Sequence, residues 1–437
     1  MKKIYFAHNA CLNSVYDLNI VKKALESSNF IIVDKIEKAD TYIYAGCGVR
    51  GVWVDGAIIE INKALKKNKN LKIIATGCFS AIEPEKILDM IQTTQVQISS
   101  FSDIVENNTD KNFEKVDLEF PQMQSAGDDN SNFKRKRLGE LKKSIVLDLQ
   151  RLDKKHGMSI EKKYKGITKG FIFYNDEEVT ENITITRGCP YQCTYCSIPI
   201  GRGNKYTSVS LGNIVKKIEQ ATKRGIKNFL LLGDELGNYG LGTNDLSFSS
   251  LLTFLFEKYD ISLSIRYIEP KPFLEHFDAI QKYCITGQIK LLYIPIQSGS
   301  NRILKMMNRT YDVSQELIEK ILCLRNNTNV VLYTNWMVGF PSETQEDIEI
   351  SKQLMQQLDF HINMVIPFSE RPNTLAEHMS NKISLKEKAL RHALLFDLAK
   401  DLKIKQFDEL LGKVDADTRE DIVLKIMEAE NYFVQID

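Results

Sequence analysis

Hydrophobic and polar positions follow two different periods along the first hundred residues. Short runs rich in β-branched and aromatic residues, such as "KIYFAH" at 3–8 and "TYIYAG" at 41–46, are separated by longer stretches with helical spacing, such as "SVYDLNIVKKALESS" at 14–28. Strands that alternate with amphipathic helices form a parallel sheet with helices on both faces. We therefore expect residues 1–101 to form a small parallel α/β domain.

The same alternation returns over residues 181–383. Six apolar runs predict strands there, namely "NITITRG", "NFLLLGDE", "ISLSIRYI", "IKLLYIPIQ", "VVLYTNWMVGF" and "FHINMVIPF". Six such βα units curl a parallel sheet into a full or partial barrel, whose active site lies at the carboxyl ends of the strands. Residues 384–437 have helical patterns and predict a helical tail.

A polar segment at 102–180 separates these two regions and predicts a linker or excursion. Its basic run, Lys134 to Arg137, is typical of a solvated face more than of a phosphate site.

Composition narrows the class of protein. The 437 residues are 43% hydrophobic and 26% charged, and the formal net charge is +1, so no global field attracts nucleic acid or anionic lipid. No apolar run approaches the roughly 20 residues that span a bilayer, and the amino terminus is unlike a signal peptide. These features predict a cytoplasmic protein without a membrane partner, in which clustered cysteines are metal ligands or redox groups.

Three of the eight cysteines crowd into "TRGCPYQCTYCSIPIGRG" at 186–203. Cys189, Cys193 and Cys196 follow directly on a predicted strand, so they lie on a loop at the active rim of the barrel. A disulfide cannot use three cysteines, and a closed zinc site would take a fourth ligand that is not near in the sequence. Three thiolates fit a 4Fe-4S cluster with one iron left open for a small molecule.

Three other cysteines share a position in the amino-terminal region. Cys11, Cys47 and Cys78 each come at the carboxyl end of a predicted parallel strand, so they should project from one edge of the sheet and form a second metal site. Cys284 and Cys323 each lie alone in an apolar helical pattern, which predicts ordinary buried packing.

The C-x3-C-x2-C spacing, with the aromatic Tyr195 before the last cysteine, resembles the radical S-adenosylmethionine (radical SAM) superfamily. The resemblance implies that the open iron chelates S-adenosylmethionine (SAM) and that an electron from the cluster cleaves it to a 5'-deoxyadenosyl radical. It also implies cofactor-binding roles for Gly233, Asp234 and Glu235, which stand where relatives often have Gly-Gly-Glu, and for Gly339 and Pro341 in "VGFPSET".

Two cysteine triplets together resemble the methylthiotransferases, which act on tRNA adenosines or on a ribosomal-protein aspartate. The shared motifs are "GCGVR" at 46–50, "TGCFS" at 76–80, "RGCPYQCTYCSIPIGRG" at 187–203, "IPIQSGSNRILKMMNR" at 294–309, "MVGFPSETQED" at 337–347 and "IPFSERPNT" at 366–374. The resemblance implies a Rossmann- or flavodoxin-like domain, a partial (β/α)6 TIM-like barrel and two 4Fe-4S clusters. It implies that SAM both methylates a sulfur at the Cys11, Cys47 and Cys78 cluster and supplies the radical. An electron donor such as flavodoxin or ferredoxin and a sulfur donor are then required. Gln297, Ser298 and Arg302 are candidates to orient cofactor or substrate, with rim packing as the alternative.

Several positions depart from the family pattern. Ala45 and Gly46 replace an Asn-Thr pair, Ser14 replaces an asparagine, and Glu269 with Pro270 replaces a Ser-His-Pro-like turn. After Lys413 the sequence is short, acidic and helix-like, so we expect the RNA-gripping TRAM barrel of the family to be missing or replaced.

These departures favour, narrowly, a peptide or protein side chain as the substrate, because an acidic cavity and a neutral chain suit RNA poorly. The alternatives are a tRNA adenosine, another radical SAM chemistry such as sulfur insertion or cross-linking on a peptide, and a non-enzymatic redox sensor.

Overall fold

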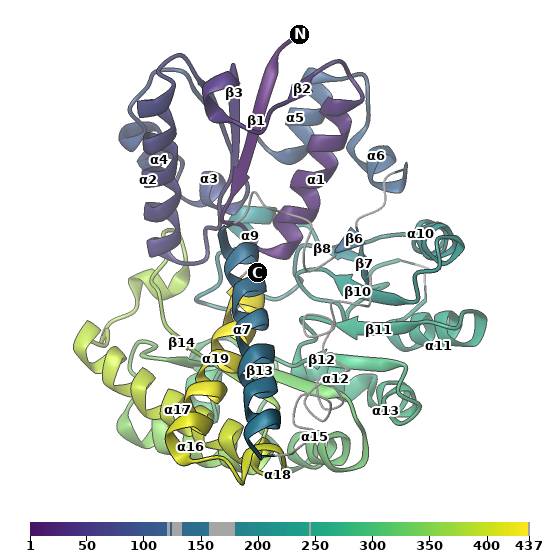
Figure 1. The fold of residues 1–437 in the computed structure, drawn as a ribbon, viewed down its shortest axis with the longest axis vertical. Helices are drawn as coiled ribbons and strands as arrows, with labels where there is room; N and C mark the ends of the chain where they lie inside the picture. Colours follow the sequence, from purple (N-terminus) through teal and green to yellow (C-terminus); the bar gives the residue numbers. More distant parts are fainter. Residues whose placement is uncertain (120–122, 125–132, 157–179, 244–245, 436–437) are drawn as a thin grey trace.

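The computed structural model describes residues 1–119, 123–124, 133–156, 180–243 and 246–435. Two sheets organise it (Figure 1). The amino-terminal sheet has five parallel strands in the order β2-β1-β3-β4-β5, and the second sheet has the order β14-β13-β12-β11-β10-β7-β6. Six strands of the second sheet are parallel, and β6 pairs with β7 in the antiparallel sense. The predicted α/β class is confirmed.

The amino-terminal domain follows the predicted alternation closely. Its elements are β1 (Lys3–His8), α1 (Leu12–Glu26), β2 (Ile31–Ile32), β3 (Thr41–Ala45), α2 (Gly51–Lys67), β4 (Lys72–Thr76), α3 (Cys78–Ile82), α4 (Pro84–Met90), β5 (Val96–Ile98) and α5 (Phe101–Asn108). Buried residues of α2 and α4 pack on one face of the sheet, and those of α1 and α5 pack on the other. Strand β3 is buried along its whole length, as expected for a central strand covered on both faces.

The barrel region contributes one strand of the second sheet for each of the six predicted units. Its elements are β7 (Thr180–Thr184), β8 (Thr186–Arg187), α9 (Ile198–Arg202), β9 (Thr207–Ser208), α10 (Leu211–Lys223), β10 (Asn228–Leu232), α11 (Phe248–Lys258), β11 (Ser262–Ile265), α12 (Pro270–Glu275), α13 (Phe277–Ile285), β12 (Ile289–Tyr293), α14 (Asn301–Met306), α15 (Gln315–Asn327), β13 (Val331–Val338), α16 (Gln345–Leu358) and β14 (Ile362–Pro367). Within the described residues the sheet ends at β14 on one side and β6 on the other, so the barrel is partial.

The segment expected to be a linker contains regular secondary structure in its described residues. Beyond α5 it contains α6 (Phe113–Glu119), the edge strand β6 (Met123–Gln124) and the 24-residue helix α7 (Phe133–His156). Four buried residues, Leu141, Ile145, Leu149 and Leu152, form an apolar stripe along α7. The sequence analysis missed this helix because charged residues outnumber the stripe. The basic run 134–137 lies within α7, and residues 157–179 lie outside the described part of the chain.

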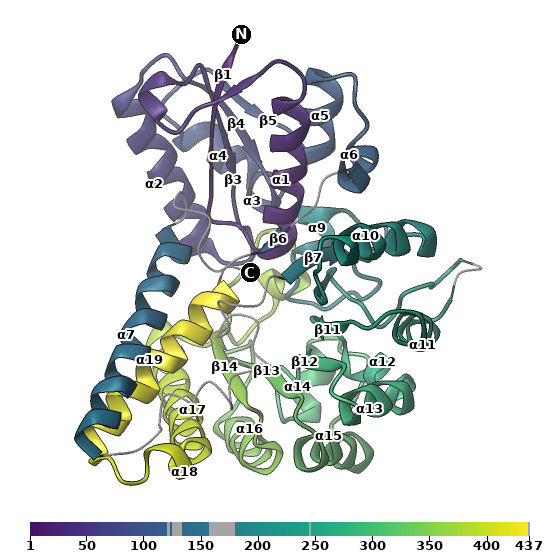
Figure 2. The same cartoon turned by 45° about the vertical axis from the view of Figure 1, so that its right-hand side comes forward.

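The tail is helical, as predicted. It consists of α17 (Leu385–Gln406), α18 (Asp408–Leu411) and α19 (Ala416–Gln435). Helix α19 packs along α7, so two segments far apart in the sequence lie side by side (Figure 2). Lys425 of α19 forms an ion pair with Asp148 of α7 at 2.9 Å. None of the helices in the described residues is both long and apolar enough to cross a bilayer.

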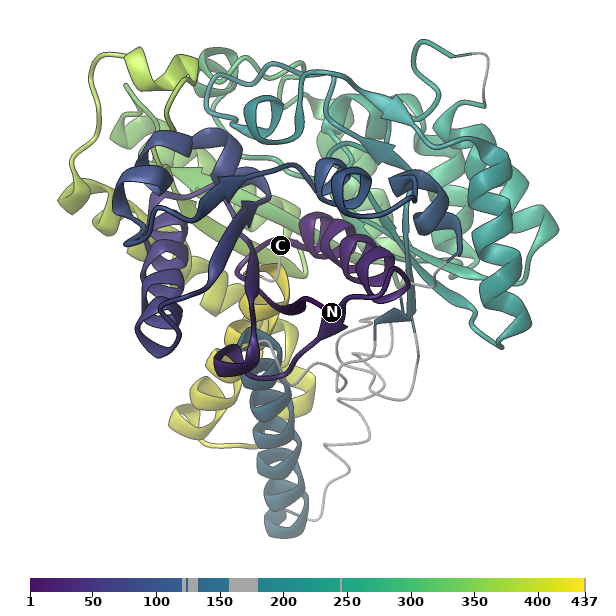
Figure 3. The same cartoon turned by 90° about the horizontal axis from the view of Figure 1, so that it is seen from above.

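The amino-terminal domain overlies the barrel, as the view from above shows (Figure 3). The carboxyl edge of its sheet faces the barrel, and α3 packs against α9. The loops that follow the strands of both sheets therefore meet at one interface, which is where parallel α/β folds build their sites.

Candidate active site between the two sheets

The amino-terminal cysteines follow three strands that are neighbours in the sheet. Cys11 is the N-cap residue of α1 after β1, Cys47 follows β3, and Cys78 is the first residue of α3 after β4. Because β1 pairs with β3 and β3 with β4, all in parallel, the three positions share one sheet edge, as predicted. Cys47 and Cys78 are buried, and Cys11 is partly exposed.

Two glycines let the loops of this edge approach each other. Gly77 has φ of +88°, a conformation that favours glycine, and a Cβ there would lie 2.9 Å from the carbonyl oxygen of Gly46. A Cβ on Gly46 would in turn lie 2.3 Å from the ring of Phe79. The glycines before Cys47 and Cys78 therefore fix how closely these two cysteines approach.

The barrel cysteines lie on the loop between β8 and α9. The Cys196 amide donates to the Cys193 carbonyl at 3.0 Å, which turns the loop back on itself. The Thr194 amide donates to the Met307 carbonyl at 3.0 Å, and the Ala376 amide donates to the Thr194 carbonyl at 2.8 Å. The "MMNR" motif and the segment just after "RPNT" thus anchor the cysteine loop from two sides.

Helix α9, directly after Cys196, brings the two triplets together. A Cβ on Gly201 of α9 would lie 3.2 Å from Cys78 Sγ and 3.0 Å from Cys78 Cβ. The absence of a side chain at Gly201 therefore lets the barrel loop reach the amino-terminal cysteine edge. The sequence placed each triplet in its own domain and did not predict this contact.

Arg202, the next residue of α9, joins the two domains. Its Nε donates to Asp234 Oδ2 at 2.9 Å, its Nη2 to Asp17 Oδ2 at 3.2 Å and its Nη1 to Ser14 Oγ at 3.3 Å. Its side chain is 10% exposed, and those of Asp17 and Asp234 are 5% and 3% exposed. Arg187 Nη1 also donates to Asp17, at 2.6 Å. Both arginines lie within the motif of the barrel triplet, but the sequence alone assigned no role to either.

Gly233 and Asp234 face the amino-terminal domain. Asn13 Nδ2 donates to the Gly233 carbonyl at 3.1 Å and to Asp234 Oδ1 at 3.2 Å. Asp234 Oδ2 also accepts the Gly188 amide at 2.9 Å, next to Cys189. Asp234 therefore connects the two cysteine loops.

Glu235 points elsewhere and is almost fully buried. Its Oε1 accepts the Gly237 amide at 2.7 Å and the Glu269 amide at 3.4 Å. Its Oε2 is buried and has no hydrogen-bond partner within the described residues. Burial, followed by the nearby carboxylate of Glu269, raises the pKa of Glu235 to about 8. A positive charge beside the free oxygen would favour the ionised form of Glu235, so this position suits a cationic group.

Glu269 forms a buried ion pair with Arg309 beside Cys193. Arg309 Nη2 donates to Glu269 Oε2 at 2.6 Å, and Nη1 donates to the Tyr195 hydroxyl at 3.0 Å and lies 3.6 Å from Cys193 Sγ. The two side chains are 5% and 6% exposed. Arg309 ends the motif that contains "QSGS", but the sequence alone assigned it no function.

Gln297 and Ser298 make contacts within the barrel wall. Gln297 has φ of +65°, and its side-chain oxygen accepts Asn335 Nδ2 at 2.9 Å. The Ser298 hydroxyl accepts the Ser300 amide at 3.2 Å and lies 3.5 Å from the hydroxyl of Ser351 in α16. These bonds join the loop between β12 and α14 to β13 and to α16.

The turn at Gly339 and Pro341 packs against the tail. Gly339 has φ of +76°, and a Cβ there would lie 2.3 Å from Cγ of Lys388 in α17. The ring of Phe340 within this turn meets that of Tyr195 edge-on, with centroids 6.4 Å apart. The turn therefore contacts the cysteine loop through Tyr195, and α17 covers its other side.

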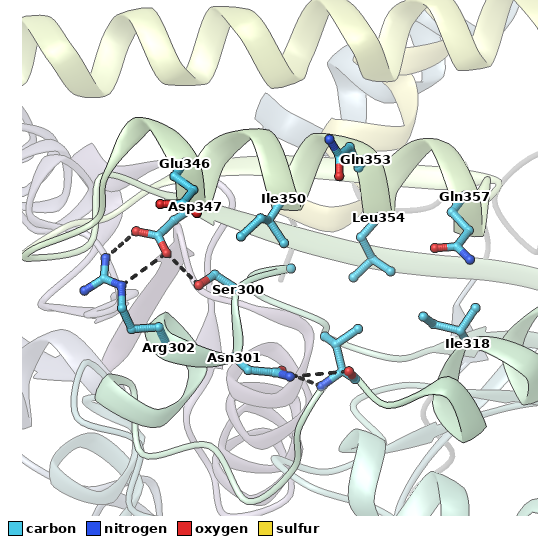
Figure 4. A pocket seen from close by; sticks show the side chains of 12 residues that line it. Ser300, Asn301, Arg302, Ile318, Glu346, Asp347, Ile350, Gln353, Leu354 and Gln357 are labelled. Carbon is cyan, nitrogen blue, oxygen red and sulfur yellow. Dashed lines mark hydrogen bonds and ion pairs between the residues drawn. The ribbon is translucent and has the colours of Figure 1, made fainter.

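A cavity of about 550 Å³ lies between α14 and α16, away from the cysteines (Figure 4). Arg302 and Asp347 form an ion pair at one end, and Asn301 exchanges hydrogen bonds with the backbone of Val313. The candidate Arg302 is thus placed on this outer groove. Arg302 and Asp347 satisfy one another, and no cysteine lines the groove, so the groove is not the candidate active site.

The donor set of each triplet suits an iron–sulfur cluster. Within the described residues no three His, Cys, Asp or Glu side chains gather tightly enough for a single ion. A four-iron cluster spreads its thiolate ligands more widely, and three soft donors at each site match a cluster with one open iron. Burial raises the pKa of Cys78 and of Cys196 to about 12, so cluster binding must displace protons from these thiols.

Comparison with known proteins identifies the class. The model described as "Radical SAM superfamily" matches residues 183–355, and the model described as "Uncharacterized protein family UPF0004" matches residues 3–99. The chain is therefore a radical SAM enzyme. The similar curated proteins include tRNA-2-methylthio-N(6)-dimethylallyladenosine synthases of Buchnera aphidicola, 28% identical over 90% of this chain and 82% of that protein, and of Fusobacterium nucleatum, 28% identical over 95% and 87%. This radical SAM enzyme is similar to methylthiotransferases over most of its length, and its cofactors are two 4Fe-4S clusters and SAM.

A solved structure supports the fold. The radical SAM methyltransferase TsrM from Kitasatospora setae, with cobalamin and a [4Fe-4S] cluster bound, aligns with a TM-score of 0.54 over 86% of this chain and 77% of that chain. At 12% identity this similarity concerns the fold alone.

Proposed function

We propose that this enzyme transfers a methylthio group to an adenosine of tRNA. The similar proteins from Buchnera aphidicola and Fusobacterium nucleatum carry the name of a tRNA synthase, and the alignments run through both domains. The comparisons give no support to the peptide or protein side chain that the sequence narrowly favoured.

The structure also removes one argument for a peptide substrate. Glu269 was expected to make the cavity acidic and to reject a phosphate-rich substrate. Its carboxylate is paired with Arg309 at 2.6 Å, so the pair adds no net charge to the cavity. An overall charge near zero remains, and phosphate contacts would have to be local.

The observation that carries the proposal is the meeting of two thiol triplets at the interface between two different sheets. We assign Cys189, Cys193 and Cys196 to the cluster that binds SAM, and Cys11, Cys47 and Cys78 to the auxiliary cluster. When bound, the first cluster would supply the electron that makes the radical, and the second would hold the sulfur to be transferred. Gly201 lets α9 of the barrel approach Cys78 of the amino-terminal triplet.

Other residues position these groups. The free buried oxygen of Glu235 accepts a hydrogen bond from the ammonium group of SAM. Tyr195 and the turn at Gly339 and Pro341 support the cysteine loop, and Arg202 holds the two domains in register. Residues 1–101 form the auxiliary domain and 181–383 the barrel, with 102–180 and 384–437 packing together through α7 and α19.

The reaction also needs components outside this chain. An electron donor such as flavodoxin or ferredoxin must reduce the barrel cluster, and a sulfur donor must restore the auxiliary cluster. We place the reaction in the cytoplasm, because a reducing compartment keeps both thiol triplets free of disulfides.

Iron content and substrate analysis test the proposal separately. Anaerobically reconstituted protein should hold roughly eight irons, falling to about four in the Cys11→Ala, Cys47→Ala, Cys78→Ala variant. Cys323→Ala, which changes a cysteine outside both triplets, serves as the control and should retain all the iron. Four irons in both the parent and the triple variant would contradict the assignment of two clusters.

Nucleoside mass analysis of total tRNA decides the substrate. Cells without this gene should lose one methylthioadenosine species, and the parent gene should restore it while the triple alanine variant should not. Unchanged nucleosides would refute the tRNA assignment, and the search would then turn to peptides and proteins.

A further inference from the structure

We propose that Arg309 is a positioning residue that raises the reduction potential of the cluster held by Cys189, Cys193 and Cys196, and that Glu269 opposes this effect. The inference rests on the ligand assignment made under the proposed function. It adds a specific pair of residues that controls how readily the enzyme accepts the electron that starts its chemistry.

The geometry directs the guanidinium of Arg309 toward a cluster ligand. Nη1 lies 3.6 Å from Cys193 Sγ, within hydrogen-bonding distance of sulfur, and it also donates to the Tyr195 hydroxyl at 3.0 Å. Nη2 donates to the Pro295 carbonyl at 3.0 Å and to Glu269 Oε2 at 2.6 Å. Three acceptors besides Cys193, on the cysteine loop and at Glu269 and Pro295, therefore hold the guanidinium against Cys193.

Burial makes this contact strong. The Arg309 side chain is 5% exposed, so water screens its charge poorly. Arginine stays protonated under all ordinary conditions, and hydrogen bonds to ligand sulfurs and nearby charge are main determinants of iron–sulfur potentials. A donor and a positive charge at Cys193 stabilise the reduced, more negative cluster. This raises the reduction potential.

Glu269 acts in the opposite direction. It stands where most members of the family have a Ser-His-Pro-like turn, and its side chain is 6% exposed. One oxygen binds Arg309, and Oε1 is buried without a partner in the described part of the chain. Its negative charge both holds the guanidinium in place and partly cancels its field at Cys193.

Redox titration of the reconstituted full-length protein tests the pair. The Cys11→Ala, Cys47→Ala, Cys78→Ala background leaves only the barrel cluster, whose reduced form is followed by low-temperature electron paramagnetic resonance. Arg309→Met should lower the ratio of reduced to oxidised cluster at a fixed potential about tenfold, which for one electron corresponds to a shift of about 59 mV. Glu269→Gln should raise that ratio, and Arg309→Lys should fall between Arg309→Met and the parent.

The control separates local contact from total charge. Lys305→Met removes a positive charge from an exposed position of α14, four residues from Arg309, and should leave the potential unchanged. Full iron content in Arg309→Met with an unchanged potential would overturn the inference. So would shifts of the same sign in Arg309→Met and Glu269→Gln, since a merely structural role predicts no opposition.

Two further outcomes are distinguishable. If Arg309→Met fails to hold iron, Arg309→Lys and Glu269→Gln still decide the sign of each shift. If the background protein itself holds no cluster, the ligand assignment fails, and the inference fails with it.

Discussion

Replacing Arg202 with methionine should weaken the docking of the two domains. The guanidinium sits between Asp17 and Asp234, whose side chains are 5% and 3% exposed. Removing one partner from a buried ion pair costs about 3–5 kcal/mol. Asp17 keeps its bond from Arg187 at 2.6 Å, and Asp234 keeps the Gly188 amide at 2.9 Å, so neither carboxylate is left without a donor. We therefore expect a loss near the lower end, about 3 kcal/mol.

The two tryptophans give each domain its own probe. Trp53 lies in α2 of the amino-terminal domain, and Trp336 lies in β13 of the barrel. Urea unfolding of metal-free proteins that retain one tryptophan each should show the Trp53 transition moving to lower urea in Arg202→Met, away from the Trp336 transition. Lys227→Met, which breaks an exposed ion pair with Asp260, should change stability by less than about 1 kcal/mol. Unchanged midpoints for both tryptophans in Arg202→Met would refute the reasoning.

Three further changes have defined outcomes. Gly77→Ala places a side chain on a left-handed backbone beside Cys78, costing about 1–3 kcal/mol, and reconstituted protein should lose about four of roughly eight irons by iron assay. Because burial raises the pKa of Glu235, the folded state keeps a proton that the unfolded state loses, and stability falls as pH rises from about 4.5 to about 8. Glu235→Gln should flatten this part of a plot of urea-unfolding stability against pH. Gly339→Ala should lower the thermal midpoint through both backbone strain and a clash with Lys388, and adding Lys388→Ala should restore only part of it.

Much of the fold follows from local pattern. Cys11, Cys47 and Cys78 were located correctly at one sheet edge because each directly follows a strand, and parallel strands share their carboxyl ends. Helix α7 was missed because its stripe of four buried residues lies among charged ones, and the distant α19 packs against it. Local composition therefore favoured a linker where tertiary packing makes a helix.

The candidate site was predictable as a list of ligands but not as an arrangement. Spacing identified the barrel triplet and strand-end positions identified the amino-terminal one, yet nothing local placed Gly201 against Cys78. Asp234 and Glu235 are adjacent in the sequence. Asp234 binds Arg202, whereas Glu235 has a buried oxygen without a hydrogen-bond partner in the described residues. Their difference depends on which domain each side chain faces. Glu269 was recognised as unusual, but its partner Arg309, 40 residues away, was not.

The pairing of α7 with α19 has a consequence for how the chain is made. Asp148 and Lys425, which join the two helices, are separated by 277 residues. A ribosome adding 5–20 residues per second needs roughly 14–55 s to cover that distance. During synthesis the apolar stripe of α7 therefore lacks its final cover for tens of seconds, and a chaperone could bind it in that interval.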